Sequence, residues 1–224
     1  DIAPEQNWAG TYGYLAERIV RVGSLEEASE IVTSGARVRP LGTRHSFNDI
    51  ADGPGVLVDL TGLPPAIEIA TDRRCAAVSA GTRYGVLARE LERHGLVLHN
   101  MGSLPHISVG GATATGTHGS GMGLGALSAA VSAVEVLGAD GELRAVRRGD
   151  SDFDGSIVAL GALGITTRVT VDVQPSYRMR QDAYSDLPWD EFLTRLPEVF
   201  SAGYSVCLFT EWDGRVREVL VKSR

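Results

Sequence analysis

Residues Gly102–Gly125 read GSLPHISVGGATATGTHGSGMGLG, and this glycine-rich stretch decides how the chain is interpreted. Small residues let the main chain approach a ligand closely, and glycine permits left-handed turns. Successive backbone N–H groups can form a concave anion site that needs no cationic side chain. The hydroxyls of Thr115, Thr117 and Ser120 add further donors. The stretch therefore predicts a diphosphate site. A flexible loop or a close backbone crossing is the alternative that glycine content alone leaves open.

Neither standard phosphate fingerprint is present in this stretch. It lacks Gly-Lys-Ser/Thr, so it is not a P-loop. The segment Gly116–Gly119 does not sit between a strand and a helix at the spacing of a dinucleotide-binding fold. A diphosphate site here would need a different backbone arrangement.

A second loop, Pro40–Asn48, reads PLGTRHSFN and follows a predicted strand at 37–41. It is again small and polar, and it holds one histidine, His45. Neutral imidazole is a nucleophile near pH 7 and can form a covalent bond to an electrophilic cofactor. The commoner alternative is a loop histidine that is hydrogen-bonded to the backbone.

Composition indicates an ordinary globular protein. The chain has 224 residues, of which 43% are hydrophobic and 22% charged, and its net charge is −7. This balance excludes disordered, collagen-like and disulfide-scaffold classes. The chain has 21 Lys and Arg residues against 28 Asp and Glu residues. This acidic excess argues against a protein that binds nucleic acid or anionic membranes in general. No apolar run approaches the ~20 residues that cross a bilayer.

Cysteine and histidine spacing favours no metal site. Cys75 and Cys207 lie far apart, and we expect both to be buried small hydrophobic residues. The five histidines are not paired at helical spacing, and no Gly-x-Ser-x-Gly supports a serine hydrolase. The segment Asp1–Pro4 carries no signal-peptide pattern, so we expect a cytoplasmic protein.

Local patterns predict a mixed α+β domain made of two subdomains, with a junction near 62–66. Ser24 and Glu27 form a capping box that opens a helix ending at Gly35. Strands at 37–41 and 56–60 then favour a small parallel β-α-β unit. A second helix, capped near Thr82, and two hairpins follow, the hairpins at 67–69 with 76–78 and 131–137 with 143–146.

From about residue 176 the chain loses glycine and gains aromatic residues, which indicates the start of a second domain. We expect a helix over 188–200 and strands over 204–210 and 216–221. A lone helix and hairpin cannot easily close a core, so we expect the chain to be part of a longer protein.

Taken together, the two loops resemble the FAD loops of the vanillyl-alcohol-oxidase flavoprotein superfamily, above all those of the bacterial alditol (xylitol) oxidases. Pro40–Asn48 is similar to the first FAD loop, and 100–121, NMGSLPHISVGGATATGTHGSG, is similar to the diphosphate loop. The segments 7–10 and 161–166 also look like that family, and the resemblance spans about 7–212.

The resemblance implies a fold and an activity. The fold would be a two-subdomain FAD-binding domain at 1–175, with subdomains of about 1–64 and 65–175. The start of an α+β substrate domain would follow at 176–224. The enzyme would oxidise a terminal hydroxyl of a polyol to an aldehyde and pass the electrons to O2, giving hydrogen peroxide. The partners would be a small polyol and O2, with no nucleic acid and no membrane.

The resemblance also implies residue roles. His45 would bear a covalent link to the 8α-methyl of the flavin, and Ser103 would lie at the flavin and touch a substrate hydroxyl. Ile165 would meet the adenine side through its backbone. The remaining FAD-binding positions would be Pro40, Leu41, Gly42, Thr43, Arg44, Ser46, Ser108, Gly111, Thr115, Gly116, Thr117 and His118.

Two departures from the family pattern bear on these roles. Arg44 replaces the small residue expected before the linking histidine, where a bulky cation could contact phosphate or crowd the loop. In the family that the chain resembles, the groups that activate the alcohol come from the C-terminal substrate domain, so they are expected beyond residue 224. Lys222 is the chain's only lysine, and it lies at the tail. An aldonolactone oxidase or dehydrogenase of the same superfamily, or an FAD-binding fragment without catalysis, are the alternatives.

Overall fold

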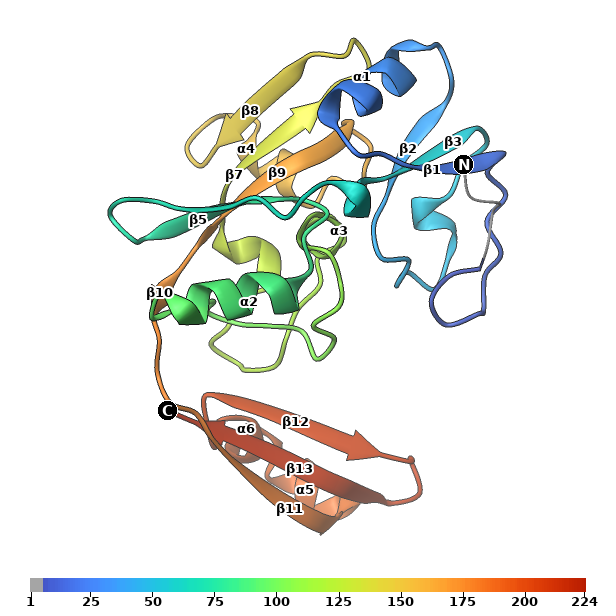
Figure 1. Cartoon of the computed structure of the whole chain (residues 1–224). Helices are drawn as coiled ribbons and strands as arrows, with labels where there is room; N and C mark the ends of the chain where they lie inside the picture. The colour runs from blue at the N-terminus through green and yellow to red at the C-terminus, as the bar shows by residue number, and fades with distance from the viewer. Residues whose placement is uncertain (1–5) are drawn as a thin grey trace.

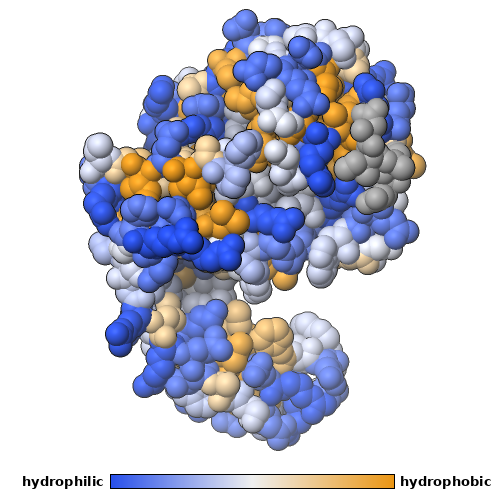
Figure 2. Space-filling view, in the orientation of Figure 1, coloured by the Kyte–Doolittle hydropathy of each residue, from blue (hydrophilic) through white to orange (hydrophobic). Residues whose placement is uncertain are grey.

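The computed structural model describes residues 6–224, and Asp1–Pro4 lies outside the described residues. The chain forms a larger unit built around two sheets and a smaller C-terminal unit built around a third sheet (Figure 1). The two units meet on one side and stand apart on the other, which leaves an open notch between them (Figure 2).

The first sheet is parallel and has three strands, in the order β1-β3-β2. Its members are β1 (Arg18–Arg21), β2 (Val38–Leu41) and β3 (Val56–Asp59), and α1 (Leu25–Thr33) is the crossover from β1 to β2. The predicted helix start is confirmed, since the Ser24 hydroxyl accepts a hydrogen bond from the Glu27 N–H at 3.2 Å. The Glu27 carboxylate accepts from Gly23 rather than from Ser24. Two short 3-10 helices, η1 (Asp49–Ala51) and η2 (Leu60–Gly62), follow β2 and β3.

The second sheet has five antiparallel strands in the order β4-β5-β9-β7-β8. Both predicted hairpins are confirmed. They are β4–β5 (Ile67–Ile69, Cys75–Ser79) and β7–β8 (Val131–Leu137, Leu143–Arg147), and β9 (Ile165–Asp172) lies between them. Apolar residues of these strands form the main core with those of α2 (Tyr84–Arg93), α3 (Val109–Ala114), η3 (Leu127–Ala130) and α4 (Phe153–Ile157). A two-residue pair, β6 (Leu96–Val97) with β10 (Gln174–Pro175), leads toward the smaller unit.

The helix predicted to start near Thr82 is present and begins at Tyr84, but no side chain caps it. The residue at the N-cap of α2 is Arg83, which makes no side-chain capping bond, and the buried Thr82 hydroxyl has no hydrogen-bond partner among the described residues. Instead, the Thr82 carbonyl accepts a hydrogen bond from the Val109 N–H at 2.8 Å, which joins this backbone to the glycine-rich stretch. Backbone pairing therefore fixes α3 against the turn that starts α2.

The C-terminal unit is a three-stranded antiparallel sheet in the order β11-β13-β12, formed by Arg180–Pro188, Arg215–Ser223 and Ser205–Thr210. The helix predicted over 188–200 is divided into α5 (Trp189–Thr194) and α6 (Leu196–Phe200). The break lies at Arg195, because Pro197 has no N–H to donate and its ring clashes with a helical carbonyl four residues earlier. Phe192, Val206, Val216, Val219 and Val221 give the unit its own small core.

These elements confirm the predicted α+β class; the domain boundaries stay a prediction. Cys75 and Cys207 are half-buried rather than buried, because both lie on strands with one partly open face. Within residues 6–224, no helix combines the length and the apolar character needed to span a bilayer.

The turn at Gly81 offers a test of how the two sheets pack. A Cβ atom at this position would lie 2.1 Å from the Leu60 carbonyl oxygen. We expect Gly81→Ala to reduce the free energy of unfolding by about 1–3 kcal/mol, as overpacking against a rigid neighbour does. Urea unfolding followed by circular dichroism measures the change. Gly123→Ala is the matched control, because its Cβ would meet nothing within 4 Å. Equal midpoints for the two variants would contradict the packing described.

Candidate functional site

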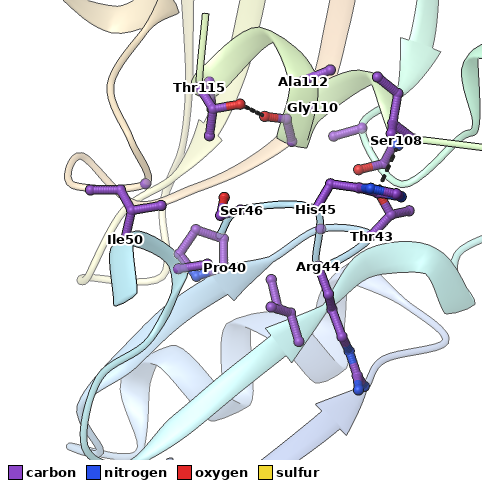
Figure 3. A pocket seen from close by; sticks show the side chains of 18 of the residues that line it. Pro40, Thr43, Arg44, His45, Ser46, Ile50, Ser108, Gly110, Ala112 and Thr115 are labelled. Atoms are coloured by element: carbon purple, nitrogen blue, oxygen red, sulfur yellow. Dashed lines mark hydrogen bonds between the residues drawn. The ribbon is translucent and has the colours of Figure 1, made fainter. Parts of the chain in front are cut away.

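A cavity of about 500 Å³ lies where the two loops singled out in the sequence meet (Figure 3). One wall is the segment that leaves β2, and the other is α3 with the residues on either side of it. The wall residues from these two segments are Pro40, Leu41, Gly42, Thr43, Arg44, His45, Ser46, Phe47, Asn48, Ile107, Ser108, Gly110, Gly111, Ala112, Ala114, Thr115 and Thr117. The fold thus brings together two loops that are separated by about 60 residues in the sequence.

The two loops touch through positions without side chains. A Cβ atom on Gly42 would lie 3.3 Å from the Gly111 Cα and 3.0 Å from the Ser108 Oγ. A Cβ on Gly111 would lie 2.8 Å from the same hydroxyl oxygen. A hydrogen bond crosses the contact, since the Ser108 N–H donates to the Thr43 Oγ1 at 3.3 Å. Glycine at both positions lets the backbones approach this closely and leaves the adjoining space open.

Within the glycine-rich stretch, Gly116 ends α3. The Thr117 N–H donates to the Ala112 carbonyl and the Gly116 N–H donates to the Thr113 carbonyl, which is the bonding pattern of a Schellman cap. Gly116 follows the C-cap residue Thr115, and its φ of +68° is the left-handed conformation that this position of the motif requires. Its Cβ would meet only the Val158 Cγ1 at 3.7 Å, so the constraint at Gly116 is conformational and not steric.

His45 is held in an apolar environment at the cavity wall. Its Nε2 is buried and has no hydrogen-bond partner in the part of the chain that the structure describes. Burial lowers the pKa of the imidazole below its usual value of 6.5, and the neighbouring His106 lowers it further. The His45 ring is therefore neutral at pH 7, which is the nucleophilic form.

Arg44 does not crowd the cavity with its side chain. It has a left-handed backbone conformation, φ +64°, and its side chain extends away from that of His45 (Figure 3). The guanidinium lies over the Tyr14 ring, with 6.0 Å between its carbon and the ring centroid. The left-handed turn thus places consecutive side chains on opposite sides of the loop.

The remaining predicted site residues lie outside the cavity wall. Ser103 is exposed on the loop that precedes α3, and His118 bonds through Nδ1 to the Gly119 carbonyl at 2.9 Å. Ile165 is buried in β9, while its neighbour Thr166 lines the cavity. Their roles, and those of the wall residues, stay predictions.

Sequence reasoning missed a third wall. Leu160 and Gly161 line the cavity, and the side chain of Arg39 donates hydrogen bonds to the carbonyls of Leu160 and Ile50. Gly161 has a φ of +72° and lies against the Pro40 ring. The only signal in the sequence was the Gly161–Thr166 segment, which resembled the family without indicating where it would lie.

The residues present fit a dinucleotide cofactor. The buried Ser108 hydroxyl has no partner within residues 6–224 and lines the cavity, and the hydroxyls of Thr43, Thr115 and Thr117 lie on the same walls. The Thr115 and Thr117 oxygens are 3.4 Å apart, and the Thr115 hydroxyl donates to the Gly111 carbonyl at 2.9 Å. Hydroxyl donors beside side-chain-free backbone suit the acceptor oxygens of a diphosphate.

Comparison with known proteins agrees with this fit. Residues 16–147 match the family model described as FAD binding domain. Alditol oxidase of a Streptomyces species is 44% identical to this chain over 97% of the chain and 53% of its own length. L-gulono-1,4-lactone dehydrogenase of Mycobacterium tuberculosis is 34% identical over 78% of the chain and 42% of its own length. The chain spans about half the length of the curated relatives it matches.

Among solved structures, cholesterol oxidase of B. sterolicum superposes with a TM-score of 0.86 at 18% sequence identity. The match covers 98% of this chain and 47% of that chain. At this identity the similarity concerns the fold alone, and it confirms the predicted FAD-binding architecture.

The left-handed backbone at Arg44 generates a prediction. A non-glycine residue in this conformation costs about 1–2 kcal/mol, whereas glycine costs about 0.5–1 kcal/mol through the unfolded chain. Arg44→Gly and Arg44→Ala remove the same guanidinium, so we expect the glycine variant to be about 0.5–1 kcal/mol more stable than the alanine variant. Urea unfolding of the pair measures this difference, and a more stable alanine variant would show that the turn is not left-handed.

Proposed function

This chain belongs to the FAD-binding-domain family of flavoproteins that includes the alditol oxidases, and from that premise we propose that it oxidises a terminal hydroxyl of a polyol to an aldehyde with O2 as the electron acceptor. Hydrogen peroxide is the second product. The observation that supports this proposal is the cavity at which the Pro40–Asn48 loop and α3 meet, in a chain that is 44% identical to an alditol oxidase. The partners are a small polyol and O2, and the cytoplasmic location expected from the sequence stays a prediction.

A second candidate is oxidation of an aldonolactone. It is favoured by the 34% identity to L-gulono-1,4-lactone dehydrogenase. L-gulonolactone oxidase of Bos taurus is also 30% identical over 80% of this chain. Both candidates use the same cofactor site and differ in the substrate and, for a dehydrogenase, in the reaction with O2.

When bound, FAD would supply the redox chemistry, which is the acceptance of a hydride equivalent from the alcohol. The protein contributes binding and orientation. We propose that Ser108, Gly111 and the Thr115–His118 segment hold the diphosphate, with the unpartnered Ser108 hydroxyl as a donor. The N–H groups of Thr115, Gly116 and Thr117 already donate to carbonyls of α3, so they shape the segment and do not bind the phosphate. Pro40–Ser46 wraps the cofactor, and the Ile165 backbone meets its adenine side. Ser103, exposed beside α3, would position the substrate hydroxyl through a hydrogen bond.

His45 would attach the cofactor covalently. Its ring lines the cavity, is neutral at pH 7 and has an unpartnered nitrogen. These are the properties that a nucleophile toward an electrophilic carbon requires. A covalent link makes the cofactor permanent, so the remaining contacts serve orientation.

Replacing His45 tests the link without removing the site. We expect His45→Ala to bind FAD in dissociable form, because the glycine contacts and the hydroxyl donors remain. Acid precipitation separates the two forms: the parent protein should give a yellow pellet and the variant a colourless pellet with yellow supernatant. A colourless pellet from the parent protein would contradict the covalent link at His45.

Substrate oxidation tests the activity directly. We expect the FAD-loaded protein to produce hydrogen peroxide with xylitol or sorbitol in a peroxidase-coupled assay, and to give little signal with L-gulono-1,4-lactone. The reverse preference would support the lactone candidate. A yellow protein that is inert toward both classes, with no change in flavin absorbance under anaerobic conditions, would show that this chain binds the cofactor without catalysis.

A further inference from the structure

The backbone on both sides of His45 is tied to the N-terminal segment. The Trp8 N–H donates to the Arg44 carbonyl at 2.8 Å. The Asn7 Nδ2 donates to the Ser46 carbonyl at 2.9 Å. These two bonds join the residue before and the residue after His45 to adjacent residues of one turn, so the turn sets where the His45 backbone lies.

The turn that makes these bonds is itself rigid. Asn7 is 4% exposed, and its Oδ1 accepts the N–H groups of Thr11 at 2.8 Å and Tyr12 at 3.1 Å. The buried Asp52 carboxylate then accepts both the Tyr12 hydroxyl and the Leu15 N–H, each at 2.7 Å. These bonds outweigh the effect of burial and hold the pKa of Asp52 below its usual value. The N-terminal turn is therefore anchored at both ends.

The side chains complete an aromatic slot, defined here as the cluster of three rings in which Trp8 and His106 each contact the His45 ring and also lie near one another. The ring centroids of Trp8 and His45 are 4.7 Å apart, and those of His45 and His106 are 4.6 Å apart. Trp8 and His106 also approach each other, at 5.9 Å. Trp8 remains 58% exposed, so its indole covers the slot and presents its outer surface to solvent.

The slot has two physical consequences. It limits rotation of the His45 ring about its side-chain bonds, because indole and imidazole lie within van der Waals reach of it. It also buries the Nε2 atom of His45, which favours neutral imidazole over imidazolium. The Nε2 atom of His106 is likewise buried, and neither Nε2 atom has a hydrogen-bond partner in the described part of the chain.

We propose that Trp8 is a positioning residue for covalent attachment of FAD: it holds the His45 imidazole in the slot against His106, ready to bond to the cofactor. This inference rests on the proposed function, because the bond itself belongs to that proposal. Trp8 acts through His45 and need not touch the cofactor.

The attachment step balances with O2 as the oxidant. A bond forms between a His45 ring nitrogen and the 8α carbon of FAD, and one C–H bond at that carbon and one imidazole N–H bond break. Two protons leave to solvent, and the electron pair of the broken C–H bond reduces the isoalloxazine. Transfer of two electrons and two protons to O2 then gives hydrogen peroxide and restores oxidised FAD, now covalently bound.

The test follows covalent incorporation in apoprotein mixed with FAD under air. Aliquots are precipitated with acid over time, and covalent flavin is measured by fluorescence of the washed protein on a denaturing gel. We expect Trp8→Ala to slow incorporation at least about 10-fold, since misplacing a reacting group by 1 Å can cost about 10²-fold. Trp8→Phe keeps an aromatic ring over His45 and should restore most of the rate.

The pH dependence separates positioning from a merely structural role. Loss of the indole exposes His45 to water and raises its pKa toward 6.5. Only neutral imidazole is nucleophilic, so the rate of incorporation falls as the pH is lowered and the ring becomes protonated. In Trp8→Ala this fall should begin at a higher pH than in the parent protein. Trp8→Phe should keep the parent profile.

Trp212→Ala is the matched control, because Trp212 is 80% exposed in the C-terminal unit and its described ring contact is with Trp189. It should leave incorporation unchanged. Incorporation by Trp8→Ala at the parent rate and with the parent pH profile would overturn the inference while leaving the proposed function intact. Loss in Trp8→Phe equal to that in Trp8→Ala would also overturn it. Parent protein that binds FAD but never links it would overturn both the covalent link and the inference.

Discussion

The close approach of Gly42 to Gly111 is the constraint on which the site depends. At this point the end of the parallel sheet and the short helix α3 lie so near that a side chain on either residue would collide with the Ser108 hydroxyl. Because no side chain fills the space beside the contact, the cavity stays open and its wall consists of backbone and hydroxyl groups. An acidic chain can hold a diphosphate in this way, since backbone N–H groups supply the partial positive charge that lysine would otherwise provide.

Both sheets position the segments that meet at the Gly42–Gly111 contact. The parallel sheet ends at Leu41 and releases the loop that carries His45, while backbone bonds from the Ala80–Thr82 turn hold the start of α3. The antiparallel sheet adds the Leu160–Gly161 wall through the connection between α4 and β9. The N-terminal turn then fixes the His45 loop from the opposite side. Four segments distant in sequence therefore form the cavity wall or hold it in place.

Much of the fold could be predicted from the sequence because its signals are local. The Ser24 cap and the turn of the hairpin at 131–137 with 143–146 act within a few residues, and the elements they predict were confirmed. Strands β1 and β11 are among those that were not identified. Strand β1 has only Ile19 and Val20 as apolar residues, and β11 is polar and exposed along most of its length. Their pairing with β3 and β13 is a property of the assembled sheet, which no local pattern carries.

At the site, too, local features could be predicted from the sequence and long-range contacts could not. Both loops were identified from composition and resemblance, because glycine content is visible in the sequence. The bonds of Asn7 and Trp8 to the His45 loop could not be predicted, since they join residues 36–39 positions apart through backbone carbonyls that any residue possesses. The structure gives a second reason for glycine at position 116, because its left-handed conformation ends α3. Its presence in the loop therefore does not by itself indicate a phosphate.

The central claim is that FAD occupies the space left open where Gly42 meets Gly111. A crystal structure of the purified protein after saturation with FAD measures this most directly. We expect the diphosphate between the Thr43–Ser46 backbone and α3, with the dimethylbenzene edge of the isoalloxazine at His45. Cofactor density in any other cavity, or a Gly42–Gly111 contact closed by neighbouring side chains in a protein that retains no FAD, would contradict it.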